Sequence, residues 1–112
     1  VIVGRGASHI LRDNPKVLRV GAVAKFEDRV ARIMKRERLG SEQAKEVVIK
    51  RDQARDHYFK RYFNLENPDD PEIYHLVLNT SDIDLEYAAD IVVQASEALA
   101  DGKLPQKVGV TV

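Results

Sequence analysis

The hydrophobic positions of the chain fall into short β-branched runs that alternate with longer segments of helical period. Residues 1–3, 17–23 and 74–78 are the runs that predict strands. A short helix is expected between the first two, over residues 7–11. Strands that alternate with helices are typical of a parallel sheet covered by helices, so the pattern predicts an α/β fold.

Two adjacent helices are predicted in the middle of the chain. Apolar residues recur at helical spacing from Phe26 onward, and this first helix is expected to stop at Gly40. Ser41 is expected to cap the second helix, which is heavily charged and runs to about residue 63. Residues 64–71 carry two prolines and several acidic side chains, so they predict a loop.

The C-terminal part of the chain predicts one more helix and a tail. Residues 79–82 are expected to cap a helix over residues 84–100. Residues 107–112 alternate in polarity, so residues 103–112 are predicted to be a tail or an edge strand. Three to four strands are few for such a sheet, and the chain opens directly on an apolar run. We therefore expect companion strands from sequence upstream or from another chain.

Composition narrows the classes of partner. With 112 residues, 44% hydrophobic and 32% charged, the chain suits one small globular domain. Lys and Arg number 18 and so do Asp and Glu, which leaves no global positive field for nucleic acid or an anionic membrane. The chain has no Cys, which suits a reducing compartment, and its apolar runs are too short to span a bilayer. A cytoplasmic protein without nucleic-acid or membrane partners is predicted.

The long second helix carries two arginines on an otherwise apolar stripe. Ala44, Val48, Arg51 and Arg55 are spaced by four and three residues and so share a face. Because an arginine keeps its charge, it must meet an acid, reach water or hold an anion such as phosphate. Pairing of Arg51 with a nearby carboxylate such as Glu46 or Asp52, or simple solvation, stays open beside phosphate binding.

A second basic cluster lies on the preceding helix. Arg29, Arg32 and Arg36 share one side of it, and guanidinium forks match phosphate oxygens. The alternative is a solvated helix face in which these arginines pair with the acidic residues close in sequence, Glu27, Asp28 and Glu37.

The remaining candidates differ in strength. Gly4-Arg5-Gly6 places a guanidinium in a turn at the end of a predicted strand, which is either a ligand site or an ordinary turn. The three histidines show no metal-ligand spacing, so no metal site is predicted. The aromatic residues at 58–63 suit a packed helix end better than a base-stacking site, and Asp69 reads as loop solvation. No Gly-x-x-x-x-Gly-Lys-Ser/Thr segment occurs.

Taken in order, these segments resemble the C-terminal half of the cytidylate-kinase-like family of P-loop nucleoside monophosphate kinases. Residues 1–6, Val-Ile-Val-Gly-Arg-Gly, look like the family's strand and Gly-Arg loop. Residues 20–38 and 50–58 resemble the helix leading into the lid and the lid itself. Residues 73–81 are the most specific block and are similar to the family's Tyr-Asp-Leu-Val-Leu-Asn-Thr-Ser stretch, although His75 stands where relatives often have Asp.

The resemblance implies a P-loop kinase-like (Rossmann-like) three-layer parallel-sheet fold, incomplete here, with a long lid helix. It places a kinase domain at residues 1–102, with the lid over about 36–72. It implies transfer of the ATP γ-phosphate to CMP or a similar nucleotide, with ATP and Mg²⁺ required by the intact protein. The implied roles are catalytic for Arg51 and Arg55, substrate-binding for Arg5, Arg55 and Asp52, and donor-nucleotide-binding for Arg29, Arg32 and Arg36.

The sequence lacks the phosphate loop that a P-loop kinase needs for activity. We expect it upstream of residue 1, and we expect this chain alone to be inactive, so whether it acts as an enzyme stays open. The rival hypothesis is a non-catalytic nucleotide-binding or protein-interaction domain that keeps the fold. The expected partners are a nucleotide such as CMP and either the upstream half of the same protein or a second copy.

Overall fold

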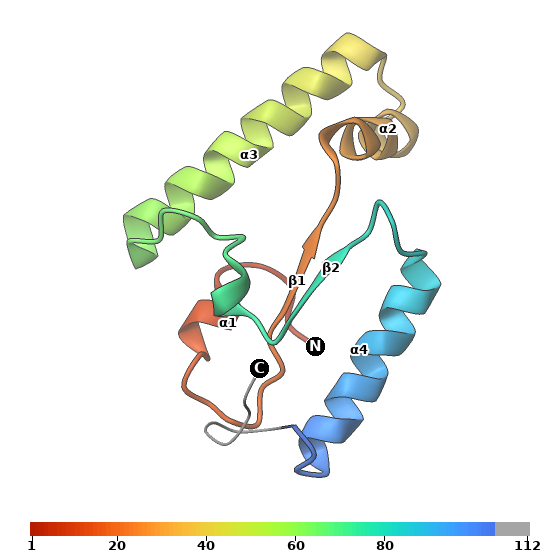
Figure 1. Cartoon of the computed structure of the whole chain (residues 1–112). Coiled ribbons are helices and arrows are strands. Elements are labelled where there is room, and N and C mark those ends of the chain that lie inside the picture. Colours follow the sequence, from red (N-terminus) through yellow and green to blue (C-terminus); the bar gives the residue numbers. More distant parts are fainter. Residues whose placement is uncertain (105–112) are drawn as a thin grey trace. The chain divides into compact units, whose positions relative to one another are not determined.

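The computed structural model describes residues 1–104, which divide into two compact units. Unit 1 holds residues 1–22 and the described chain from Pro71 onward, and unit 2 is Val23–Asp70. Figure 1 labels the elements in chain order: α1 (Ala7–Ile10), β1 (Val20–Val23), α2 (Phe26–Glu37), α3 (Ser41–Phe63), the 3₁₀ helix η1 (Pro71–Ile73), β2 (Leu76–Asn79) and α4 (Leu85–Ala100).

Strands β1 and β2 form a two-stranded parallel sheet, and helices separate them along the chain (Figure 1). The backbone N–H groups of His75 and Leu76 both donate to the carbonyl of Arg19, at 2.8 and 3.3 Å. Gly21 of β1 is buried beneath the Tyr74 ring. A Cβ at this position would lie only 3.0 Å from that ring, so the close approach favours glycine. The predicted α/β class is confirmed at this level, while the three-layer kinase-like part of that prediction stays a prediction.

The predicted strand at residues 1–3 is wrong. These residues are not in a strand, and Val1, Ile2 and Val3 are 124, 68 and 87% exposed. β-branched residues favour strands only where a neighbouring strand supplies hydrogen bonds and packing. Within residues 1–104 the sheet consists of β1 and β2, so this run has no strand to pair with.

The glycine turn after this run is confirmed and has an unusual backbone. Gly4, Arg5 and Gly6 have φ angles of 77, 59 and 72°, so three consecutive residues lie in the left-handed region. The turn leads into α1, as predicted from the short helical segment. Arg5 adopts a conformation that L-residues other than Asn and Asp avoid, at a cost of roughly 1 kcal/mol.

Unit 2 is built on a helical hairpin in which α2 packs against α3. Its core consists of Val30, Ile33, Ala44 and Val48, which occupy the apolar stripes of the two helices. Both helices were predicted from this spacing, and their presence is confirmed.

The predicted junction between the two helices is shifted. α2 ends at Glu37 and not at Gly40, because Arg38 turns left-handed (φ 56°) and its N–H donates to the Met34 carbonyl. Gly40 is the N-cap of α3, and the helix has no side-chain capping bond. Ser41 is the first residue of the helix itself. The predicted Ser41 cap is therefore wrong by one residue.

Helix α4 begins one residue later than predicted and has a different cap. The side chain of Asp84 accepts a hydrogen bond from the Glu86 N–H at 3.3 Å, which satisfies one of the free donors of the first turn. The predicted capping segment 79–82 instead forms a turn, in which Asn79 Oδ1 accepts from the Ser81 N–H at 3.0 Å. Ala88 is buried in this unit.

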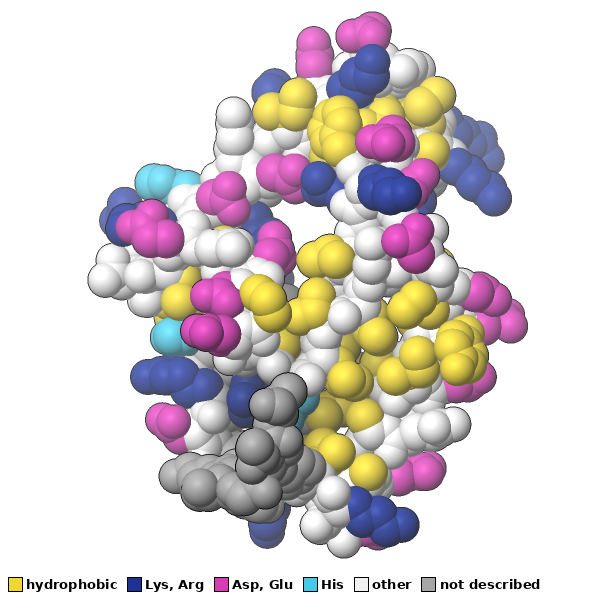
Figure 2. Space-filling model, viewed as in Figure 1, with side chains coloured by type: hydrophobic (Ala, Val, Ile, Leu, Met, Phe, Trp, Pro, Cys, Tyr) yellow, Lys and Arg dark blue, Asp and Glu magenta, His cyan; other side chains and the backbone are white. Residues whose placement is uncertain are grey.

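The remaining predictions concern the C-terminal tail, membrane crossing, the surface charge and the loop after α3. The strand predicted at residues 107–112 lies outside the described residues. Within residues 1–104, no helix has the length and apolar character that crossing a membrane requires. Basic and acidic side chains are interspersed over the face seen in Figure 2. The loop predicted at residues 64–71 is confirmed as far as η1, which begins at Pro71.

Candidate functional site

The proposed phosphate-binding arginines of unit 2 lie on the α2–α3 hairpin. Arg29, Arg32 and Arg36 belong to α2, and Arg51 and Arg55 belong to α3. The two helices bury their apolar stripes against each other, so the charged positions beside those stripes are left at the surface. Three of these arginines form ion pairs, each with a carboxylate from a different element.

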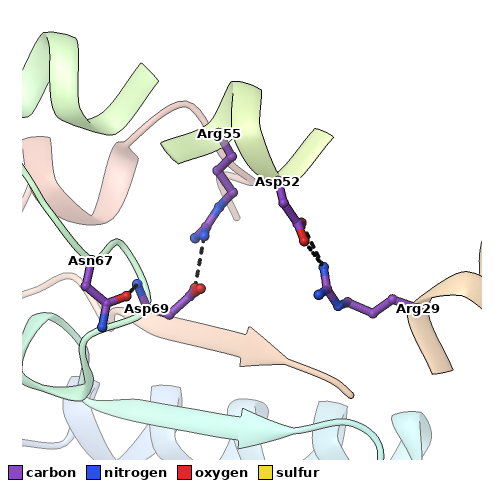
Figure 3. A network of polar contacts seen from close by, with 5 residues as sticks. All are labelled: Arg29, Asp52, Arg55, Asn67 and Asp69. Carbon is purple, nitrogen blue, oxygen red and sulfur yellow. Dashed lines mark hydrogen bonds and ion pairs between the residues drawn. The ribbon is translucent and has the colours of Figure 1, made fainter. Parts of the chain in front are cut away.

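Arg29 connects α2 to α3. Its Nη1 contacts both carboxylate oxygens of Asp52, at 2.7 and 3.0 Å. Its guanidinium carbon also lies 5.9 Å from the centroid of the Phe26 ring. Arg29 and Asp52, predicted to serve donor and acceptor nucleotides respectively, are therefore direct partners of each other (Figure 3).

Arg51 makes a second link between the helices. Its two terminal nitrogens reach the two carboxylate oxygens of Glu37, at 2.7 and 3.0 Å, in a bidentate pair. This contact lowers the pKa of the Glu37 carboxyl and raises that of the Arg51 guanidinium, first through the hydrogen bond and then through charge. The sequence suggested Glu46 or Asp52 as partner, because side chains near in sequence meet on one helix. The hairpin instead brings Glu37 to Arg51.

Arg55 pairs with a loop and not with a helix. Its Nη1 lies 3.0 Å from Oδ1 of Asp69, in the segment that follows α3 (Figure 3). Its guanidinium carbon also lies 5.2 Å from the centroid of the Phe59 ring. Asp69 is thus a half-exposed loop residue, as predicted, but it also has an ion-pair partner that the sequence did not indicate.

A turn presents Asp69 to Arg55. The Asn67 side-chain oxygen accepts from the Asp69 N–H at 3.0 Å, and the Asn67 carbonyl accepts from the Asp70 N–H at 3.2 Å. Asn hydrogen-bonded to the backbone two residues ahead is a common turn signal. The spacing Asn67-x-Asp69 was thus the sequence signal for this carboxylate, although it did not identify the arginine.

The other proposed arginines lie at three further positions. Arg32 is half-buried and Arg36 is exposed; the charge of Arg36 contributes to lowering the pKa of Glu37. Arg5 is exposed in the left-handed turn of unit 1 and so belongs to a different compact unit from the hairpin.

The aromatic residues at the end of α3 contact one another. The Tyr58 ring lies 5.6, 5.1 and 5.8 Å from the rings of Phe59, Tyr62 and Phe63, in tilted or edge-on arrangements. Such geometry is typical of packed aromatic clusters. Tyr62 is nevertheless 64% exposed, so this cluster caps the helix end at the surface.

No metal centre is formed by the part of the chain that the structure describes. Residues 1–104 contain no group of three His, Cys, Asp or Glu side chains that could hold an ion.

One contact not foreseen from the sequence lies in unit 1. The ring nitrogen Nδ1 of His75 accepts a hydrogen bond from the Arg19 backbone N–H at 3.0 Å. The Arg19 side chain donates from Nε to the Ile73 carbonyl at 2.9 Å. Burial, and then the charge of Arg19, lower the pKa of His75. A neutral histidine can accept this bond, because its unprotonated ring nitrogen carries a lone pair.

Comparison with known proteins places these features in a family. The model of the cytidylate kinase-like family matches residues 1–82, which contain every proposed site residue. A crystal structure of an uncharacterized protein from Eubacterium ventriosum is similar, with a TM-score of 0.79 and 26% sequence identity. That similarity covers 88% of this chain and 54% of the other, so the chain spans about half the length of that protein. A search of curated proteins finds no match. Since the family model covers well over half of its residues, the chain belongs to the cytidylate kinase-like family.

Proposed function

We propose that this chain supplies the arginine-bearing lid and part of the acceptor site of a nucleotide kinase, which transfers the γ-phosphate of ATP to CMP or a similar nucleoside monophosphate. The observation that supports this most directly is the family match, because it includes Arg5 and the five hairpin arginines that are proposed to bind phosphate. In this proposal the phosphate loop belongs to polypeptide outside these 112 residues, since the sequence contains no Gly-x-x-x-x-Gly-Lys-Ser/Thr segment.

The proposed mechanism rests on charge neutralisation and positioning. Phosphoryl transfer needs little covalent help from a protein, and guanidinium groups stabilise the charge on the phosphate oxygens. Arg51 and Arg55 are proposed to contact the transferred group, with Asp52 and Arg5 on the acceptor. Arg29, Arg32 and Arg36 are proposed to serve the donor nucleotide.

The described residues do not provide a binding site for magnesium. The reaction of this family implies ATP with Mg²⁺, but residues 1–104 contain no cluster of metal-binding side chains. These residues therefore do not fit a protein-held metal ion, and we assign no step to one.

The site assignment is tested by calorimetric titration of the protein with CMP, UMP, AMP and ATP. Arg55→Ala is expected to weaken CMP binding about tenfold, the loss typical of a hydrogen bond to a charged group. Arg61→Ala is the matched control, because Arg61 is an exposed arginine of the same helix that lies over Tyr62. Equal CMP affinity in the wild type and Arg55→Ala would remove Arg55 from the site.

A non-catalytic nucleotide-binding or interaction domain is the second candidate, and the similarity to an uncharacterized protein leaves it in place. It predicts CMP binding without transfer of phosphate from ATP in the longest polypeptide that contains this sequence. Both candidate functions involve a nucleotide as partner. We also propose a macromolecular partner, which is either further polypeptide of the same protein or a second copy of this chain. Sedimentation of the purified protein measures the copy number.

A further inference from the structure

The three ion pairs of the hairpin differ in what they hold together. Arg29–Asp52 and Arg51–Glu37 each join α2 to α3, so their four side chains fasten the two helices on which the core of unit 2 depends. Arg55–Asp69 joins α3 to the loop that follows it. A ligand can therefore take the place of Asp69 without separating the packed helices.

The Arg55–Asp69 pair is also open to solvent. The two side chains are 41 and 49% exposed, and Nη1 of Arg55 lies 3.0 Å from Oδ1 of Asp69. Exposed pairs of this kind are weak, because water competes for both charges. A phosphate group carries up to two negative charges and three acceptor oxygens, so it outcompetes one carboxylate oxygen for a guanidinium.

The surroundings of Arg55 keep its guanidinium in place when the carboxylate leaves. The Phe59 ring, one turn further along α3, lies 5.2 Å from the guanidinium carbon and supports it independently of the loop. Asn67 holds Asp69 through its backbone N–H (Figure 3). Because this bond does not involve the carboxylate, a change of the Asp69 side-chain rotamer would leave it intact.

We propose that Asp69 is an internal competitor for phosphate at Arg55: its carboxylate occupies the guanidinium in the free protein and is displaced by the phosphate of a bound nucleotide. This inference rests on the proposed function, because it takes Arg55 as a phosphate ligand. It assigns Asp69 a role that lowers affinity. A residue that merely orients Arg55 would raise affinity, so the sign of the effect distinguishes the two.

The test compares the binding of CMP and of cytidine, which lacks the phosphate, to the wild type and to Asp69→Asn. Asparagine keeps the size and the turn but removes the charge. CMP affinity is expected to rise about two- to five-fold, the range that corresponds to an exposed ion pair, while cytidine affinity stays unchanged.

Glu66→Gln is the matched control. It removes the same charge from the same loop, where Glu66 pairs with Lys60 and not with a proposed site residue. An equal rise in CMP affinity in Glu66→Gln would attribute the effect to overall charge and overturn the inference. A rise confined to Asp69→Asn supports it.

Arg55→Ala separates this inference from the function on which it rests. If Arg55→Ala does not change CMP affinity, the assignment of Arg55 fails and the inference fails with it. If Arg55→Ala weakens CMP binding while Asp69→Asn leaves it unchanged or weakens it, the function stands and the competitor role is overturned. In the Arg55→Ala background, Asp69→Asn is expected to have no effect, because the group it competes for is gone.

Discussion

His75 and Arg19 are joined by two hydrogen bonds of opposite direction. The His75 N–H donates to the Arg19 carbonyl at 2.8 Å, and His75 Nδ1 accepts from the Arg19 N–H at 3.0 Å. The second bond requires an unprotonated Nδ1. The side chain of His75 thus extends the pairing between the segments that enter β1 and β2.

We expect this contact to make stability depend on pH. Burial and the charge of Arg19 lower the pKa of His75 in the folded protein. Below about pH 6.5, the usual pKa of histidine, the unfolded chain then binds a proton that the folded protein does not, so stability falls as pH decreases. Above that pH the stabilisation is fully present. Melting temperatures between pH 5 and 8 measure the effect.

Two variants of His75 serve as controls. His75→Asn keeps an acceptor that does not titrate, so the pH dependence below 6.5 should become smaller than in the wild type. His75→Ala removes the acceptor and is expected to lower the free energy of unfolding by about 1 kcal/mol at pH 8, the usual value for a hydrogen bond. An unchanged pH profile in His75→Asn would contradict the role of this residue.

The backbone strain at Arg5 and its proposed role in binding can be measured separately with one variant. It has a φ of 59°, which glycine adopts at no cost, so Arg5→Gly is expected to stabilise the turn by up to about 1 kcal/mol. If Arg5 binds the acceptor phosphate, the same variant should weaken CMP binding. Chemical denaturation and calorimetric titration measure the two effects.

Arg38→Gly is the matched control for Arg5. Arg38 is also an exposed arginine with a left-handed φ, of 56°, but it ends α2 and has no proposed role in binding. The substitution should stabilise the protein to a similar extent and leave CMP affinity unchanged. Stabilisation by both variants with no change in CMP affinity in either would exclude Arg5 from the acceptor site.

The core of the hairpin should account for much of the stability of unit 2. Ile33 is 8% exposed and packs with Val30, Ala44 and Val48. Ile33→Ala removes apolar contacts and leaves a cavity, so the free energy of unfolding should fall by about 2–4 kcal/mol. Ile49→Ala, at a position of α3 that is 46% exposed, should change it by less than about 0.5 kcal/mol. Urea unfolding followed by circular dichroism measures both.

The Arg51–Glu37 pair should respond to charge reversal. Glu37→Arg places a second positive charge beside Arg51, where the end of α2 meets the middle of α3, and is expected to lower the melting temperature. Adding Arg51→Glu restores opposite charges and should recover part of the loss. Failure of the double variant to recover stability relative to Glu37→Arg would show that the 2.7 and 3.0 Å contacts do not couple the helices.

The elements that could be predicted are those whose signal is local. The apolar spacing from Phe26 to Met34 and along α3 follows directly from the helical period, and the structure contains both helices. The turn at Gly4 and the loop after residue 63 were likewise marked by glycine, proline and polar residues. Helix ends were less accurate, because capping depends on backbone angles that neighbouring residues share, as at Arg38 and Asp84.

The ion-pair partners of the arginines could not be predicted from the sequence. Their spacing identified a basic helix face, but it suggested partners for Arg51 close in sequence. The actual partners of Arg51 and Arg55 are Glu37 and Asp69, because a helix reversal and a loop bring distant residues together. Whether these arginines bind phosphate is a prediction that the titrations above test.

The sequence by itself determined the two adjacent helices, the glycine turn and the family of this chain, because each depends on the order and spacing of residues close in sequence. Only the tertiary structure decided that residues 1–3 are not a strand, since a strand needs a partner. It also decided which carboxylate neutralises each arginine, since an ion pair forms between side chains near in space whatever their separation along the chain.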